Sequence, residues 1–155
     1  MKTKILTMFA LVMFSAQVMA WDAEKEFKTN CATCHSIGNG DVDLAGKKLQ
    51  GPDLAGVSKR RNLDWLVKFV KYPEGMFMGD DEEAGYEKVD PIAAKVYALY
   101  KPNQMADQEL DKAQIQAMLK YIDSKKKQPK GKIACFEKSK KTAADIKNCI
   151  KLAKK

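Results

Sequence analysis

A single pentapeptide, Cys31-Ala32-Thr33-Cys34-His35, limits what this chain can fold into more than any other stretch of its sequence. In a helical turn, side chains three and four residues apart lie on the same face, so both thiols and the imidazole would point the same way. Two thiols at this spacing form thioethers with the two vinyl groups of a haem, and the adjacent imidazole ligates its iron. The spacing therefore predicts one covalently attached c-type haem, bound by Cys31 and Cys34, with His35 as an axial ligand.

Two other chemistries use cysteines at this spacing. A thioredoxin-like redox pair needs a strand before its first cysteine, and no alternating apolar pattern precedes Cys31. A zinc site needs four ligands, usually cysteine, histidine or carboxylate side chains. His35 is the only histidine of the chain, and the two remaining cysteines lie about a hundred residues further along. The sequence therefore favours haem attachment over redox or zinc chemistry.

The first 20 residues have the composition of a secretory signal peptide. Lys2 and Lys4 form a short positive region, Ile5 to Phe14 an apolar stretch, and Val18-Met19-Ala20 a small-residue cleavage site. The apolar stretch is too short to span a membrane, which favours cleavage after Ala20 over an uncleaved N-terminal anchor. Haem attachment takes place on the exported side of a bacterial membrane, so we expect a periplasmic protein in which disulfides can form.

Charge divides the remaining chain into two parts. Residues 21–124 carry 14 Lys and Arg against 18 Asp and Glu, whereas residues 125–155 carry 12 Lys against 2 acidic residues. The first part is long enough for one hydrophobic core. We therefore expect a mildly acidic haem domain over 21–124, followed by a lysine-rich extension over 125–155.

The apolar periodicity of the domain is helical throughout. Capping residues and the spacing of apolar residues predict helices over 22–33, 62–72, 90–101 and 111–124. Glycines and prolines predict that most of 36–61 is loop. The segment Glu74 to Glu87 is rich in acidic residues and is interpreted as a solvated insertion. The spacing of its acidic residues is not that of an EF-hand loop, which argues against a calcium site.

A haem iron held by one histidine has a second axial position, which a methionine thioether can fill. Met105 follows a proline in a short connection between two expected helices and is the favoured ligand. Met76 and Met78, in the acidic segment, are the alternatives, and Met118 falls on the apolar stripe of the last helix and is assigned to the core. Without a methionine ligand the iron would be five-coordinate or bound by a lysine nitrogen. An open position would bind small ligands or activate peroxide.

Four features follow one another along the chain: the attachment motif, Gly51-Pro52-Asp53-Leu54, a helix with Trp65-Leu66-Val67, and Met105 ahead of the last helix. In this order they resemble the class I cytochrome c family, in particular its small bacterial periplasmic monohaem members. The resemblance covers about 27–122. It implies an all-α fold, a cytochrome c-like haem domain of about four helices with long loops, which is followed here by a C-terminal helical hairpin.

The resemblance also implies roles for single residues. The carbonyl of Pro52 is expected to accept a hydrogen bond from the ring nitrogen of His35 that does not bind iron. Phe27 and Tyr121 are expected to meet where the first and last helices cross. Trp65 is expected near a haem propionate.

A protein of this kind is a one-electron carrier rather than an enzyme. Its single haem c would cycle between Fe(III) and Fe(II) with His35 and Met105 as axial ligands. The expected partners are redox proteins, with a quinol-oxidising complex or dehydrogenase as the donor and a terminal oxidase or reductase as the acceptor. A haem c subunit of a larger oxidoreductase is the main alternative, and a ligand-binding or peroxidase-type haem protein is a lesser one.

The lysine-rich extension contains the two remaining cysteines, Cys135 and Cys149. In an exported chain whose other cysteines hold haem, this pair predicts a disulfide. Helical signals over 133–138 and after Thr142 predict a hairpin that the disulfide closes. The hairpin is expected to dock on an acidic surface of a redox enzyme, of anionic lipid or of the domain itself, or to remain a solvated tail. Export argues against nucleic acid as a partner.

Overall fold

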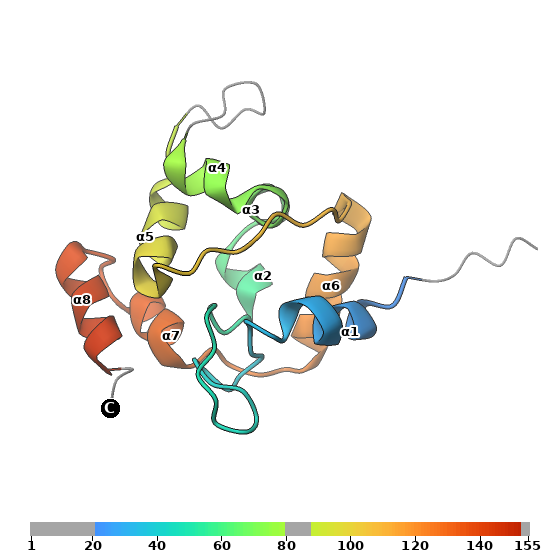
Figure 1. Ribbon diagram of the computed structural model, residues 1–155, viewed down its shortest axis with the longest axis horizontal. Helices are drawn as coiled ribbons and strands as arrows, with labels where there is room; N and C mark the ends of the chain where they lie inside the picture. Colours follow the sequence, from blue (N-terminus) through green and yellow to red (C-terminus); the bar gives the residue numbers. More distant parts are fainter. Residues whose placement is uncertain (1–20, 80–87, 153–155) are drawn as a thin grey trace, which may run out of the picture.

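Helices make up the regular structure of this chain, as the ribbon in Figure 1 shows. The computed structural model describes residues 21–79 and 88–152, so the expected signal peptide lies outside the described residues. Within these ranges there is no β-strand, only an isolated antiparallel bridge between Val42 and Lys48. The helices are α1 (Ala23–Glu26), a π-helix (Phe27–Cys31), α2 (Val57–Arg60), α3 (Leu63–Lys71), α4 (Pro73–Met78), α5 (Pro91–Tyr100), α6 (Lys112–Ser124), α7 (Gly131–Lys138) and α8 (Ala143–Leu152). The predicted all-α fold is confirmed.

The N-terminal helix is one element with two windings. Asp22 caps α1 by accepting hydrogen bonds from the backbone N–H groups two and three residues further on, at 2.9 and 3.0 Å. From Phe27 the winding widens to the π-helix, which ends at Cys31, the first cysteine of the attachment motif. The helix was predicted to extend to residue 33 but ends at Cys31. The N–H of Cys34 bonds to the carbonyl of Cys31 and closes a turn there.

This N-terminal helix packs against α6, which lies beside it in Figure 1. The rings of Phe27 and Tyr121 lie 5.6 Å apart, as expected where the first and last helices meet. Phe27 is buried together with Met118 and Ile122 of α6, and Cys31 packs against the same cluster. The attachment motif therefore begins at the edge of a small hydrophobic core.

Three longer helices form close to where the sequence predicted them. Asn62 caps α3 by accepting a hydrogen bond from the third N–H of the helix, and Asp90 caps α5 in the same manner. Asp111 begins α6 with a capping box, in which it exchanges two hydrogen bonds of 2.8 Å with Gln114. These starts were predictable because a cap and its partners are close neighbours in the sequence.

Two short helices, α2 and α4, were not predicted. Pro73 ends α3 as expected, but it also occupies the first turn of α4, where its missing N–H costs nothing. Met76 and Phe77 of α4 are buried against Ala93 of α5. The interpretation of this stretch as solvated loop was therefore wrong for residues 74–78, because burial against α5 stabilises a helix with no side-chain cap of its own. The acidic run itself, residues 80–87, lies outside the described residues.

The C-terminal extension forms a helical hairpin on the outside of α5 (Figure 1). A disulfide joins Cys135 of α7 to Cys149 of α8, with their Cα atoms 5.6 Å apart. The buried residues of this region form one cluster that spans both parts of the chain: Leu99, Tyr100, Ile133, Phe136 and Cys149. The hairpin is therefore part of a shared hydrophobic core and does not project as a solvated tail.

Polar contacts add to this attachment. The carboxylate of Asp41 accepts hydrogen bonds from the hydroxyl of Tyr100 (2.9 Å) and from the backbone N–H of Lys132 (2.9 Å). The ammonium group of Lys132 donates to the carbonyl of Leu99 (3.2 Å) and lies 3.9 Å from the centre of the Tyr100 ring. These contacts join the loop after the attachment motif to α5 and to the start of α7.

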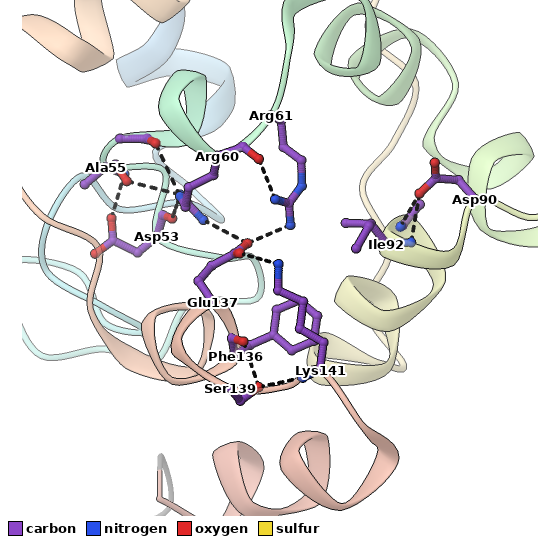
Figure 2. A network of polar contacts seen from close by, with 12 residues as sticks. Asp53, Ala55, Arg60, Arg61, Asp90, Ile92, Phe136, Glu137, Ser139 and Lys141 are labelled. Carbon is purple, nitrogen blue, oxygen red and sulfur yellow. Dashed lines mark hydrogen bonds and ion pairs between the residues drawn. The ribbon is translucent and has the colours of Figure 1, made fainter.

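An ionic cluster joins α7 to α2 (Figure 2). One oxygen of Glu137 lies 2.6 Å from the guanidinium of Arg61 and 3.8 Å from that of Arg60, and the other oxygen lies 2.9 Å from the ammonium of Lys141. Arg60 also donates to the backbone carbonyls of Asp53 (3.2 Å) and Ala55 (3.1 Å). The extension thus contacts α2 as well as α5, and Arg60 links this contact to the loop that precedes α2.

We expect Phe136→Ala to lower the free energy of unfolding by about 3–5 kcal/mol, since its side chain is fully buried and its removal leaves a cavity in the shared core. Leu152→Ala is the control, because Leu152 is 62% exposed and should change stability by less than about 0.5 kcal/mol. Guanidinium unfolding of the full-length protein, followed by circular dichroism, measures both. Equal stabilities would show that the extension contributes little to the core.

Candidate haem centre

The attachment motif forms the turn that follows the π-helix. The backbone N–H of His35 bonds to the carbonyl of Cys31 at 2.8 Å, so the three motif side chains project from a single turn. Cys31 and Cys34 are free, half-buried thiols. Burial raises the pKa of Cys31 to about 11, so the unmodified side chain stays a neutral thiol at neutral pH. Both cysteines and His35 line one cavity.

The side chain of His35 is held in one tautomer. Its Nδ1 lies 2.8 Å from the carbonyl oxygen of Pro52, and because a carbonyl can only accept, Nδ1 carries the proton. Burial lowers the pKa of His35, so the imidazole is neutral and the lone pair of Nε2 is free to bind a metal. The expected contact between His35 and Pro52 is present in the structure.

Gly51 makes room for this imidazole. A Cβ at position 51 would lie 2.6 Å from Nδ1 of His35, which is closer than real carbon atoms approach. The backbone N–H of Gly51 bonds in turn to the carbonyl of Cys34 at 2.8 Å. Glycine is therefore required here by the close approach of the ring and not by an unusual backbone conformation.

Asp53 fixes the loop that carries Pro52. Its carboxylate is fully buried and accepts hydrogen bonds from the N–H groups of Gly38 (2.7 Å), Gly40 (2.8 Å) and Ala55 (2.9 Å). It also accepts a hydrogen bond of 3.1 Å from the backbone N–H of Lys130, in the extension. Sequence reasoning quoted Asp53 only as part of a motif and missed this role. The signal was an aspartate near several glycines whose backbone N–H groups need acceptors.

Two adjoining cavities, with volumes of about 270 and 120 Å³, lie next to the motif. Seven residues line both of them: Cys31, His35, Pro52, Phe69, Val96, Met105 and Gln108. The structure therefore brings Met105, which comes from the irregular segment between α5 and α6, to the same space as His35. Met76 is buried against Ala93, and Met78 is 55% exposed; neither lines these two cavities.

The second cavity is mostly apolar, with a few charged side chains in its wall. Trp65 lines it, as do Arg60 and Arg61, and the Arg61 guanidinium lies 5.5 Å from the centre of the Trp65 ring. Ile133 and Glu137 of the extension also line it. Sequence reasoning singled out Trp65 but missed the other four. The available signal was that Arg60 and Arg61 are the only arginines in a chain otherwise rich in lysine.

The donor groups of this site suit a c-type haem. Two thiols at the required spacing, a neutral imidazole and a thioether surround one hollow, and aromatic and aliphatic side chains form much of its remaining wall. The zinc alternative finds no support among the described residues, where no group of three or more His, Cys, Asp and Glu side chains is arranged to hold a metal ion.

Comparison with known proteins gives the same class. The family model for cytochrome c matches residues 22–126, about two thirds of the chain, and the chain belongs to the cytochrome c family. Among solved structures it is similar to the cytochrome c domain of the pp3183 protein from Pseudomonas putida. That match has 29% sequence identity, covers 65% of this chain and 84% of that one, and has a TM-score of 0.46. A search of curated proteins gives no match.

Membership of this family confirms that the chain is a c-type cytochrome, as the resemblance indicated. It implies haem c as the cofactor, electron transfer as the activity and other redox proteins as partners. The matched region ends at residue 126, so α7 and α8 lie beyond it. Both helices nevertheless contribute to the packing described above, and α7 contributes residues to the cavity wall.

We expect Gly51→Ala to displace His35, because the added methyl group occupies the space of its ring. The purified protein should contain less haem, and its stability should fall by about 1–3 kcal/mol. Gly46→Ala is a matched control, since nothing lies within 4 Å of its Cβ position and only its φ of +82° adds strain. Haem content per chain and unfolding midpoints test this. Native values for Gly51→Ala would contradict the steric role of this glycine.

Proposed function

We propose that this chain is a periplasmic monohaem cytochrome c that carries one electron at a time between respiratory redox partners. One observation supports this most directly: His35, with its free Nε2, and Met105 line the same cavities beside the two cysteines of the attachment motif. Cys31 and Cys34 would hold the haem through thioethers, and His35 and Met105 would be its axial ligands. When bound, the haem supplies an iron that alternates between Fe(III) and Fe(II).

The roles of the protein groups follow from their contacts. The Pro52 carbonyl orients the imidazole and would make its Nε2 a stronger electron-pair donor to iron. The buried Asp53 carboxylate fixes the loop that carries Pro52. Phe69 and Val96 give both cavities an apolar lining, which would limit contact between a bound haem and water. Two protein ligands leave no position for a substrate, which suits electron transfer and disfavours ligand binding or peroxidase chemistry. Arg61 and Trp65 line the second cavity and would be available as donors to the carboxylates of a haem.

One observation bears on the proposed export. The disulfide between Cys135 and Cys149 favours an oxidising compartment, which supports export by the signal peptide proposed for residues 1–20. None of the helices within 21–79 and 88–152 has the length and apolar character needed to cross a membrane.

Ligation by Met105 predicts a closed, low-spin iron. The oxidised protein should show the weak far-red band of an iron–sulfur bond, and carbon monoxide should not change the spectrum of the reduced protein. Met105→Ala should remove the band and allow carbon monoxide to bind. Met78→Ala, at a side chain that is 55% exposed, should change neither property and serves as the control. A native spectrum for Met105→Ala would exclude this ligand, and rapid carbon monoxide binding by the unaltered protein would favour a ligand-binding or catalytic role.

The outer surface of the extension is proposed to bind an acidic redox protein. Lys138, Lys140, Lys147 and Lys151 are exposed, whereas the apolar side of the same hairpin faces α5. This surface would serve a diffusing carrier and equally a haem subunit assembled into a larger oxidoreductase. Deletion of residues 128–155 would expose the shared core, so substitution of surface lysines is the better test.

We expect the oxidation rate of the reduced protein by membranes of its host cell to fall steeply with added salt. Lys147→Glu combined with Lys151→Glu should flatten this dependence. The control pair, Lys25→Glu with Lys120→Glu, makes the same change in net charge elsewhere and should retain most of it. An unchanged slope for the first pair would contradict docking by α8. Cosedimentation with phosphatidylglycerol vesicles would assign the surface to lipid instead.

A further inference from the structure

Arg60 and Arg61 stand out because every other positively charged residue of this chain is a lysine. Their side chains are only 15% and 12% exposed, and both line the second cavity. Burying a cation costs free energy unless a partner compensates it. Part of that compensation comes from backbone carbonyls: Arg60 donates to the carbonyls of Asp53 and Ala55, and Arg61 donates to the carbonyl of Arg60 at 2.6 Å.

Glu137 is the carboxylate within this cluster. Its contacts with Arg60, Arg61 and Lys141 place one negative charge among three positive ones, and its side chain is 14% exposed. Burial alone would raise the pKa of Glu137, but hydrogen bonds and charges from Lys141 and Arg61 outweigh that effect and hold it below the usual value. The carboxylate is therefore ionised at neutral pH. Because the cluster is little exposed, salt screens its field less than that of surface charges.

The position of this carboxylate is set by the extension. Glu137 follows Phe136, which is fully buried in the core shared with α5, and the disulfide at Cys135 ties the same helix to α8. Figure 2 shows Glu137 reaching from α7 toward the two arginines. α7 lies beyond the region matched by the cytochrome c family model. The extension therefore adds a fixed negative charge to the wall of the second cavity.

We propose that Glu137 lowers the reduction potential of the haem bound in this cavity. This rests on the proposed function, which places the haem there. Reduction adds one electron to Fe(III), and a fixed negative charge in a poorly solvated wall opposes that addition. The same negative charge offsets part of the field of Arg60 and Arg61, which would otherwise favour the reduced iron. The C-terminal extension therefore contributes to the potential at which this carrier works.

The test is the midpoint potential of the full-length, haem-loaded protein, measured by spectroelectrochemical titration. Glu137→Gln keeps the shape of the side chain and removes its charge, so the midpoint should shift to a more positive value. At a fixed mediator potential, the ratio of reduced to oxidised protein should then rise several-fold. Glu137→Asp alters packing but keeps the charge, and its midpoint should stay much closer to that of the unaltered protein.

Two further variants make the result specific. Glu24→Gln removes a surface carboxylate that pairs with Lys28 at 2.7 Å, and it should leave the midpoint nearly unchanged. Arg61→Gln removes a positive charge from the cluster and should shift the midpoint in the opposite direction from Glu137→Gln. If Glu137→Gln does not fold, the sign of the Arg61→Gln shift decides, and a positive or absent shift overturns the proposal.

The proposal is also overturned if Glu137→Gln has a native absorption spectrum and an unchanged midpoint, or if the Gln and Asp variants shift it equally. The last result would indicate an effect of packing and not of charge. These outcomes are distinct from failure of the proposed function. In that case the unaltered protein itself would lack a haem c spectrum, whatever residue stood at position 137.

Discussion

The hydrogen bond between Nδ1 of His35 and the carbonyl of Pro52 is the contact on which the site depends. It selects the tautomer that leaves Nε2 free, and it requires the chain at Gly51 to pass against the ring without a side chain. The loop can make this approach because the buried carboxylate of Asp53 gathers the N–H groups of Gly38, Gly40 and Ala55. Three glycines, a proline and an aspartate thus position one imidazole. The orientation of this proposed iron ligand follows from the folding of a loop that contains almost no regular structure.

The same loop connects the haem domain to its extension. The carboxylates of Asp53 and Asp41 accept hydrogen bonds from the backbone N–H groups of Lys130 and Lys132. The guanidinium of Arg60 donates to the backbone carbonyl of Asp53. The opposite net charges of the two parts suggested attraction between an acidic domain and a basic tail. The contacts are of another kind. Apolar side chains of α5, α7 and α8 form the shared core, and the buried ion pairs place cations on the domain and the anion on the extension. The extension's lysines are left largely on its outer surface.

This arrangement separates two tasks within one small protein. The inner side of the extension contributes Ile133 and Glu137 to the wall of the cavity, where they would border the proposed haem. The outer side carries exposed lysines that are available to a partner. A chain ending near residue 126, where the cytochrome c match ends, would leave Leu99 and Tyr100 of α5 without the residues that cover them. The extension is therefore best understood as a part of the protein's core that also presents a charged surface.

What the sequence determined is local. The attachment motif, with its thiols three residues apart and its imidazole next to the second, needs only one turn of chain to bring the groups together, and the caps at Asn62, Asp90 and Asp111 act within three residues. Met105 was preferred to Met76 and Met78 because it follows a proline in a short connection between two expected helices. Only the tertiary structure shows that it lines the cavity. Only the fold could decide that Asp53 meets Lys130 and that Arg61 meets Glu137, contacts that join residues 77 and 76 positions apart. Such pairs leave no periodic trace in a sequence, because their free energy depends on burial, and burial exists only once the whole chain has packed.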